Sequence, residues 1–462
     1  MKPFISFSLF LMTALTGFSQ LPTAFYSGKY AGVQSVTHNP AMLNTNSYKY
    51  SINLFNIHSY LGNNQAAFKL SDQFQFSDSY FEDNFYGENS GLATGLVNVD
   101  ILGPSFQFNV GKKNSFAVFS RLRAMGNITD FDGKLAHSIS KDFEGNDPDL
   151  PYTFGNNANM RIALNAWAEI GASFSRNLYN TTKHSITGGI NIKYLSGAGN
   201  GYMQINNFTG TINEDMVNQD LYLNNTTGTV GIGFAGMSFE DPDLEKIMES
   251  SGNGIGFDLG VVYELKKSGP LSTNSSTEYK LKAAISVTDI GAISYDKDPA
   301  RSGTYTAQIT GAERFYFSQL EDVSLDNYNE FFSSHPQYFT PAPDNIEAVL
   351  KTNLPTTLNI DLDYNLNSKF YLNFGTKLPL SNIDDKPYIN KYYTGVSLTP
   401  RFETRGFSFG IPVHYNELTK MNAGVYLQAG PLFLGSGSVI SALISESKQA
   451  DFVLGISFGG KK

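Results

Sequence analysis

Apolar and polar residues alternate one by one through the segment 357–377. In the first arm, TLNIDLDYNL, the even-numbered residues from Leu358 to Leu366 are apolar and the odd-numbered residues are polar. The second arm, KFYLNFGTK, alternates again after a link at 367–368. A period of two is that of a β-strand with two unlike faces. Each arm is about ten residues long, the length that a tilted strand needs to cross the hydrocarbon layer of a bilayer.

The same alternation recurs along the whole chain. Further strands are expected at 48–54, 105–110, 116–122, 168–174, 186–194, 257–265, 281–287, 396–398, 407–413 and 452–458. An amphipathic hairpin in a soluble sandwich would alternate in the same way. Here the polar face carries charges and the chain starts with an export signal, so the pattern favours a closed barrel whose polar face lines a lumen. We therefore predict an all-β fold, a single transmembrane antiparallel β-barrel.

The links between these strands predict a topology. Short links at 111–114, 179–183, 367–368 and 402–405, and a moderate one at 266–278, alternate with long links at 61–100, 125–163, 196–253 and 291–354. This order is typical of short periplasmic turns and long extracellular loops. About 14 strands are expected, within a range of roughly 12–16 for an even-numbered barrel. A count of about 14 requires a hairpin at Gly430-Pro431; in the alternative, the proline marks a bulge in one long strand.

Smaller signals refine this picture. The apolar register of the first strand flips at Phe55 and Ile57, which suggests a bulge. A short helix is expected within a loop at 439–447. Helix starts are expected at Asp241-Pro242 and Pro343-Asp344, each followed by a helix-compatible run.

The chain before the first strand divides into two parts. Residues 1–19 read as a signal peptide, with Lys2, an apolar core and small residues before a cleavage site at Ser19-Gln20. We therefore expect export and insertion in the outer membrane. Residues 20–47 show no period and few charges, whereas a disordered leader would be more polar. We expect this segment to fold into the lumen as a plug, followed by a barrel at 48–462.

Composition agrees with a barrel and excludes other classes. The chain has 36 Phe and 26 Tyr but a slightly polar mean hydropathy of −0.22. Beyond the N-terminus, no apolar run is long enough for a membrane-spanning helix. The absence of cysteine excludes disulfides, thiolate metal sites and cysteine nucleophiles. A net charge of −9 argues against a nucleic-acid partner.

No motif predicts catalysis or a cofactor. The six histidines lack the spacing of metal ligands, and neither a nucleophile elbow nor a phosphate-binding loop is present. Asp361 and Asp363 share a strand face at a spacing of about 7 Å. Such a pair could do acid–base work or bind a cation. We favour the alternative that both line the lumen and pair with basic neighbours such as Lys377. The acidic run 142–151 has oxygen ligands for Ca²⁺ without EF-hand spacing. The aromatic, acidic loop 73–89 suits a sugar or protein partner, or a lid. We therefore expect no enzyme and no cofactor.

Strand parity places several charges on inward faces. The predicted lumen-facing charged residues are Arg121, Arg123, Lys193, Asp258, Glu264, Asp361, Asp363 and Lys377. We expect such inward charges, Arg121, Lys193, Asp258 and Asp361 among them, to satisfy the backbone of the N-terminal segment.

Three short motifs carry a family resemblance. Asn39-Pro40-Ala41, just before the first strand, resembles the hatch motif of FadL-like outer-membrane barrels. The run SVTDIG at 286–291 is similar to a strand-end motif of their relatives. The tail, GPLFLGSG at 430–437 and ADFVLGISFGG at 450–460, resembles an uncharacterised outer-membrane family known only by a domain-of-unknown-function label. The resemblance implies a 14-stranded barrel, an N-terminal plug at Asn39, Pro40 and Ala41, and passage of hydrophobic molecules through a lateral opening in the wall. Inward charges and a short segment before the first strand depart from that pattern.

Two functions from different classes follow. The first is a plugged FadL-like channel for passive uptake of small molecules, hydrophobic ones included. The alternative is a non-enzymatic structural or accessory barrel of an outer-membrane secretion or assembly complex. Outer-membrane lipid is an expected partner of both, a small-molecule ligand of the first, and a protein bound through the long extracellular loops of the second. An open or plug-blocked channel favours transport, and a packed core favours the scaffold.

Overall fold

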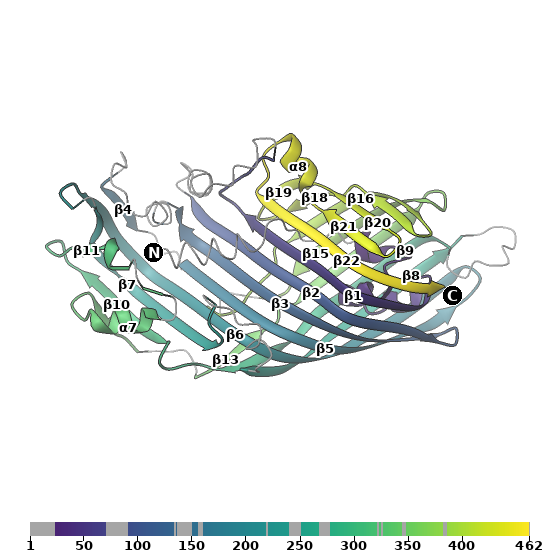
Figure 1. Cartoon of the computed structure of the whole chain (residues 1–462), viewed down its shortest axis with the longest axis horizontal. Coiled ribbons are helices and arrows are strands. Elements are labelled where there is room, and N and C mark those ends of the chain that lie inside the picture. Colours follow the sequence, from purple (N-terminus) through teal and green to yellow (C-terminus); the bar gives the residue numbers. More distant parts are fainter. Residues whose placement is uncertain are drawn as a thin grey trace.

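The computed structural model is a closed antiparallel β-barrel of 14 strands, as the sequence predicted (Figure 1). It describes residues 24–70, 91–133, 135, 150–155, 160–218, 220–239, 251–267, 278–320, 323–324, 327–343, 348–381 and 386–461. Strand β1 (Tyr48–Asn63) pairs with β2 on one side and with the last strand, β22 (Gln449–Lys461), on the other, which closes the ring. Among the described residues, no helix is long and apolar enough to cross a membrane.

The wall between these two strands follows the order of the chain. It continues through β2 (Leu92–Val110), β3 (Asn114–Asp132), β5 (Met160–Asn180), β6 (His184–Asp215), β8 (Gly252–Lys266), β9 (Tyr279–Asp296), β14 (Thr357–Asn365), β15 (Phe370–Pro379), β16 (Gly395–Thr404), β17 (Phe407–Gly410), β20 (Val425–Ala429) and β21 (Leu432–Ser436). Some positions hold two shorter strands in line. β7 (Asp220–Gly236) precedes β8, β13 (Val349–Asn353) precedes β14, β18 (Val413–Asn416) follows β17, and β19 (Lys420–Ala423) precedes β20.

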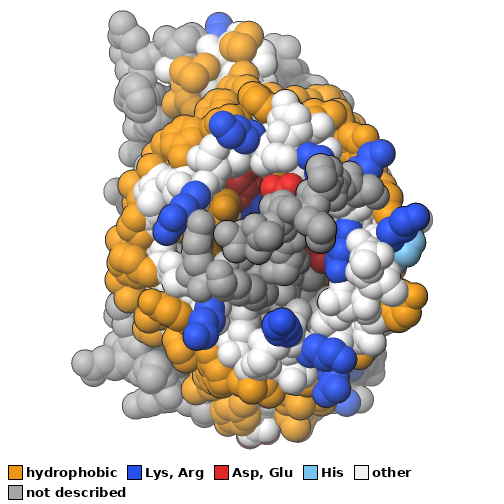
Figure 2. All heavy atoms as spheres, turned by 90° about the vertical axis from the view of Figure 1, so that its right-hand side faces the viewer, with side chains coloured by type: hydrophobic (Ala, Val, Ile, Leu, Met, Phe, Trp, Pro, Cys, Tyr) orange, Lys and Arg blue, Asp and Glu red, His pale blue; other side chains and the backbone are white. Residues whose placement is uncertain are grey.

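Side chains alternate between lumen and outer surface as predicted. In β14, Asp361 is 2% exposed and its neighbour Leu362 is 42% exposed. Outward rings also stack across strands: the centroids of Phe108 and Phe116 lie 5.7 Å apart, and those of Phe116 and Phe174 lie 5.1 Å apart. Figure 2, which views the end with the short turns, shows apolar side chains around the outside and acidic ones inside the mouth. A closed barrel with an apolar outer face is suited to a bilayer because every spanning backbone group is paired within the wall.

The short turns gather at one end, where β1 starts and β22 ends. Gly430 adopts a φ of 59° and begins the turn between β20 and β21, so the hairpin predicted at Gly430-Pro431 is confirmed. Glycine adopts this left-handed backbone without steric cost. The predicted bulge near Phe55 is also confirmed, because the β1–β22 register shifts between Asn53 and Phe55. By the convention for such barrels, this end faces the periplasm.

The bounds predicted for the long links are wrong, because much of the chain within them is strand. β6 runs for 32 residues and forms a tall hairpin with β7. Further pieces pack on this hairpin: β4 (Tyr152–Gly155), β10 (Gly303–Ile309), β11 (Phe315–Tyr316), η2 (Phe317–Leu320), α7 (Tyr328–Ser334) and β12 (Phe339–Pro341). Beyond the bilayer the strands need no lipid-facing apolar row, so the alternation that marks a spanning strand fades there.

The helix predictions had mixed outcomes. The helix expected at 439–447 is confirmed as α8 (Val439–Ile444). The run after Pro343-Asp344 was predicted helical, but its described part forms β13, which pairs with the end of β9. The end of β9 offers a free strand edge, and hydrogen bonds to this edge outcompete a helix of one or two turns, because so short a helix is marginal in water. The predictions for residues 1–19, 73–89, 142–149 and Asp241-Pro242 lie outside the described residues.

The segment before β1 lies inside the barrel. It forms α2 (Ala24–Ser27), η1 (Gly32–Thr37) and α3 (Met42–Thr45), drawn in purple in Figure 1. Val33, Val36 and Leu43 pack against inward residues of β2 and β3, and Phe25 packs against Tyr426 and Phe433. Its apolar side chains are therefore buried against the inner wall rather than exposed to water.

Candidate functional site

Ionised side chains form a buried cluster at mid-height in the lumen. Arg123 contacts Asp289 at 2.9 Å and Glu169 at 3.1 Å. Lys193 contacts Asp289 at 2.6 Å and Asp258 at 2.8 Å. Because these groups come from β3, β5, β6, β8 and β9, they tie neighbouring strands together across the inner wall. Buried charges of this kind are tolerated only when they are paired and hydrogen-bonded.

A bulge in β9 brings Asp289 into this cluster. The β8–β9 register shifts between Phe257 and Leu259, and Asp289 adopts a φ of 60°. Its backbone N–H donates to the Asp258 carboxylate at 2.7 Å. The sequence run SVTDIG at 286–291 is therefore a bulged stretch of β9 that aims a carboxylate into the lumen.

A second pair of residues extends the charge cluster towards β2. The Arg121 Nε donates to Asp100 Oδ1 at 2.7 Å, and Arg121 also lies 3.6 Å from Glu169. Arg123 stacks on the indole of Trp167, with 4.6 Å between the guanidinium and the ring centroid. The planar guanidinium groups thus serve both as donors to carboxylates and as stacking partners.

The N-terminal segment is held by polar side chains of the wall. Asp361 accepts from Ser27 Oγ at 3.1 Å and lies 2.6 Å from His38 Nε2. Lys282 donates to the Ser27 carbonyl, and Arg401 donates to the Ala24 carbonyl at 3.2 Å. Further wall-to-backbone bonds come from Asn191 to Val36, from Ser286 to His38 and from Ser175 to Ala41, at 2.9, 2.6 and 3.1 Å. Side chains, not strand pairing, therefore attach this segment.

The motif Asn39-Pro40-Ala41 fits against two wall glycines. Asn39 Oδ1 accepts from the Ala41 N–H at 2.9 Å, and Asn39 Nδ2 donates to the Ile285 carbonyl at 3.1 Å. A Cβ at Gly260 would clash with the Asn39 side chain, and one at Gly189 would clash with the Pro40-Ala41 backbone. Glycine is needed at both wall positions because the backbone of the segment approaches the wall closely.

Burial changes the acidity of two groups in the segment. It raises the pKa of the Tyr26 hydroxyl, an effect that Asp100 adds to. It lowers the pKa of Lys29, although Glu403 acts in the opposite direction. The Lys29 ammonium lies 5.3 Å from the centroid of the Tyr371 ring, which supplies a cation–π contact.

A second segment, 386–394, also enters the lumen, between β15 and β16. Its side chains Tyr388, Ile389, Tyr392 and Tyr393 are buried in a cluster that includes Trp167. Asn390 donates to Asn127 Oδ1 at 3.1 Å, and the Lys391 N–H donates to the same oxygen at 3.0 Å. We call residues 386–394 the inward loop. It reaches from one side of the barrel to β3 on the other.

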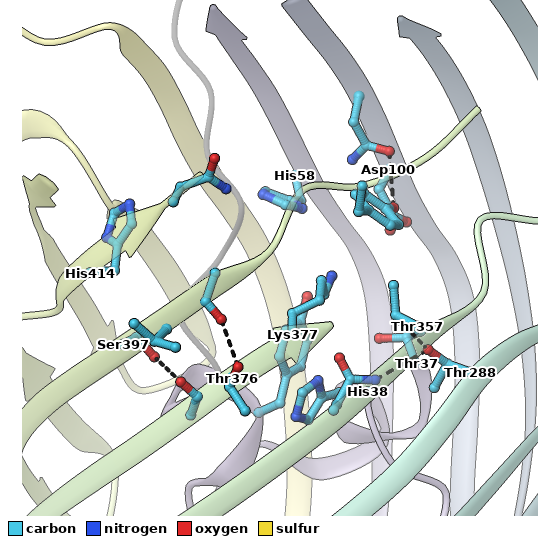
Figure 3. Close-up of a pocket in the computed structure, with 18 of the residues that line it drawn as sticks. Thr37, His38, His58, Asp100, Thr288, Thr357, Thr376, Lys377, Ser397 and His414 are labelled. Carbon is cyan, nitrogen blue, oxygen red and sulfur yellow. Dashed lines mark hydrogen bonds between the residues drawn. The ribbon is translucent and has the colours of Figure 1, made fainter. Parts of the chain in front are cut away.

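A cavity of about 80 Å³ lies between the N-terminal segment and the inward loop. Tyr26, Thr37 and His38 line it from the segment, and Tyr392 lines it from the loop. Most other lining residues are polar wall residues, and Figure 3 shows ten of the lining residues with labels. The volume suffices for several waters or a small solute.

The predicted lumen-facing residues occupy different surroundings. Arg121, Arg123, Lys193 and Asp258 are buried in the charge cluster, and Glu264 is half-buried near the short-turn end of β8. Asp361 and Asp363 are buried too, but Lys377 is not their partner: Asp363 pairs with Arg401 at 2.7 Å, and Lys377 lies opposite Asn359. Of the four charges expected to satisfy the N-terminal backbone, Arg121, Lys193 and Asp258 pair within the cluster, and Asp361 contacts the side chains of Ser27 and His38. Lys282 and Arg401, which were not among the four, donate to carbonyls of the segment. The prediction failed there because parity fixes a face, not the height on it.

Within the described residues, no group of three or more His, Asp or Glu side chains is arranged to hold a metal ion. The sequence singled out the run SVTDIG but did not place its Asp289 in the lumen, and it singled out neither Arg401 nor the inward loop. Arg401 lies in β16 next to Pro400, beyond the part of this strand, 396–398, that was predicted. The inward loop has no periodic pattern that separates an inward fold from an outward one.

Comparison with known proteins gives a family and a set of similar solved structures. The model of a family of unknown function, DUF5723, matches residues 40–437. No curated protein matches the chain. Similar solved structures include the toluene transporter TbuX of Ralstonia pickettii, at 11% identity and a TM-score of 0.36 over 93% of this chain and 94% of that one. A FadL homologue of Pseudomonas aeruginosa matches at 11% identity and 0.33, over 96% and 98%. The translocator domain of the autotransporter NalP from Neisseria meningitidis matches at 7% identity and 0.34, over 92% and 94%.

Proposed function

We propose that this chain, which belongs to the DUF5723 family of unknown function, is a gated channel for small molecules whose N-terminal segment is the plug. The observation that carries this proposal is how the segment is attached. Its described contacts with the wall are side-chain hydrogen bonds and apolar packing, with no strand pairing to the wall. Individual bonds of this kind contribute roughly 1 kcal/mol each, and none of them is a strand-pairing bond of the wall, so their loss would leave the pairing of the barrel intact.

The inward loop supports the same proposal from the opposite side. It enters the lumen between the end of β15 and the start of β16, whereas the N-terminal segment directly precedes β1. The cavity lies between them, lined by Tyr392 of the loop and by Tyr26, Thr37 and His38 of the segment. A scaffold barrel has no need of such a cavity. The polar residues that line the cavity fit a polar solute better than a hydrophobic one.

Deletion of residues 24–38 tests the plug directly. We expect a folded barrel whose conductance in planar bilayers exceeds that of the full chain, because the deletion removes one of the two barriers. A barrel that folds but keeps background conductance would place the accessory role ahead. Val217→Ser at the exposed tip of the β6–β7 hairpin, where Val217 is 90% exposed, is the control and leaves conductance unchanged.

A reversible lock tests whether the segment moves. The chain has no cysteine, so Gly32→Cys with Ser51→Cys introduces the sole thiol pair. A Cβ at residue 32 would lie 3.1 Å from the Cβ of Ser51, a little closer than the roughly 3.5–4.5 Å of a disulfide. We expect solute flux into proteoliposomes to rise on reduction. Flux that ignores the reductant, as in each single-cysteine control, would show that the segment does not gate.

A further inference from the structure

We propose that the cavity between the two lumen segments binds a small oxyanion, a carboxylate or phosphate, at Lys377. The proposal names the class of solute that the proposed channel would carry. It rests on the proposed function only for the role of the bound anion, whereas binding itself does not depend on that function. The proposal comes from the hydrogen-bonding needs of the groups that face the cavity.

Lys377 has no carboxylate partner among the described residues. It lies on the inward face of β15, opposite Asn359 of β14 and Gly395 of β16. Its ammonium lies 4.4 Å from the centroid of the Tyr392 ring, a contact that satisfies none of its three N–H donors with an oxygen. An ammonium in such a lumen requires acceptors, from water or from a bound anion.

The acidic groups that line the cavity are already engaged. Asp100 accepts from Arg121, and Asp289 contacts both Arg123 and Lys193. Their carboxylates are therefore engaged with other cations, and among the described residues no ion pair joins either of them to Lys377. A solute with its own oxyanion supplies what the wall does not.

Two histidines lie around the same space, and one of them adds a donor. His58 and His414 line the cavity, and the His58 Nε2 and His414 Nδ1 atoms are buried with no hydrogen-bond partner. In Figure 3, the Lys377 side chain rises into the middle of the cavity, with His58 above it and His414 to its left. The His58 Nε2 donates to an oxyanion when it carries its proton. The His414 Nε2 instead donates to Gln449 Oε1 at 3.2 Å, which leaves Nδ1 of the neutral ring as an acceptor.

The periplasmic mouth favours the approach of an anion. Its short turns carry exposed basic residues, among them Lys112, Lys113, Lys183, Lys267, Lys369 and Arg405, and Figure 2 shows blue side chains around the opening. Basic residues around an opening raise the local concentration of anions. The attraction is screened by salt over about 8–10 Å near physiological ionic strength.

Binding to the full mature chain in detergent tests the site without any transport assay. We expect acetate or inorganic phosphate, titrated at constant ionic strength against chloride, to raise the temperature at which the folded band is lost in heat-modifiability gels. Acetate alone would identify a carboxylate site and phosphate alone a phosphate site. Stabilisation by neither ion beyond chloride would mean that water alone fills the cavity, and would overturn the proposal.

Variants assign the effect to Lys377. Lys377→Gln should weaken binding about tenfold or more, the loss expected for one charge-assisted hydrogen bond. Lys377→Arg, which keeps the charge, should retain binding and shows that the position tolerates change. Lys351→Gln, at an exposed position of β13 that is not among the basic residues of the mouth, is the matched control and binds like the wild type. Undiminished binding in Lys377→Gln would reject the site.

The two proposals fail separately. Oxyanion binding with background conductance after deletion of residues 24–38 would leave the site standing without the channel. Raised conductance with no oxyanion binding would leave the channel standing without this site.

Discussion

A single position along a strand decides whether a side chain meets lipid or lumen. Leu362 and Asp361 are neighbours, yet one is exposed on the outside and the other holds the N-terminal segment. A slip of one residue would exchange these faces, so the register of β14 is strongly specified. The same reasoning makes the outcome of a charge substitution depend on parity.

Leu362→Arg should destabilise the barrel by about 2–4 kcal/mol, because it places a cation on the lipid face in the middle of a strand. Asn367→Arg, on the turn of the same hairpin, should cost roughly 0–1 kcal/mol, as charges near the interface do. Urea unfolding followed by the fluorescence of Trp167 measures both, since it is the one tryptophan in the chain and is buried in the lumen. Equal costs would contradict a lipid-facing position for Leu362 in the middle of the membrane.

Gly260→Val should displace the N-terminal segment and leave the barrel folded. The new side chain would occupy the space of Asn39 and Pro40. Lys29 is buried in the wild type and should become a site of tryptic cleavage, detected by intact mass. Gly231→Ala is the control, because its Cβ would meet Thr304 at an ordinary 3.7 Å. Protection of Lys29 in Gly260→Val would show that the segment does not depend on this glycine.

At the scale of elements, alternation predicted the spanning strands and little else. The hairpin 357–377, the bulge near Phe55 and the turn at Gly430-Pro431 were predictable because lipid imposes an apolar face and turns impose glycine. The tall β6–β7 hairpin was not, since the bilayer imposes no pattern beyond its edge. Asp289 was not predicted either, because its inward direction comes from a bulge that breaks parity.

Asn127→Ala should loosen the inward loop. The substitution removes the oxygen that accepts from both Asn390 and Lys391, a loss of roughly 1–3 kcal/mol in the attachment of the loop. External trypsin on intact cells should then cleave after Lys391 faster than in the wild type. Thr153→Ala, which removes an exposed hydroxyl pair with Thr211, should not change the rate. An unchanged rate in Asn127→Ala would mean that aromatic packing alone holds the loop.

At the scale of the whole molecule, the lumen is filled by two segments from distant parts of the chain. The family resemblance suggested the first from Asn39-Pro40-Ala41, and the structure adds the second. The sequence had no signal for the second because a tyrosine-rich link reads the same whether it folds inward or outward. The candidate site was therefore only partly predictable: Lys377 was placed in the lumen, but its neighbours were not.

Heat-modifiable migration in SDS gels tests the closed ring as a unit. The mature chain should fractionate with outer membranes and migrate differently before and after boiling, because the paired wall resists detergent. A chain that lacks β22 should lose this difference, since two unpaired edges remain. Recovery of the mature chain as a soluble periplasmic monomer would contradict a membrane barrel.

The pairing of β1 with β22 has a consequence for the order of assembly. These strands come from opposite ends of the chain, so their contact has the greatest sequence separation in the wall and a correspondingly high entropic barrier. Ring closure is then expected to be a late, slow event, with two free edges that need protection until it occurs. The segment just before β1 already touches β5, β6, β9 and β14 on the inside. A nascent barrel must therefore close around its own N-terminal segment. Any factor that catalyses the pairing of β1 with β22 has to let that segment enter the lumen first.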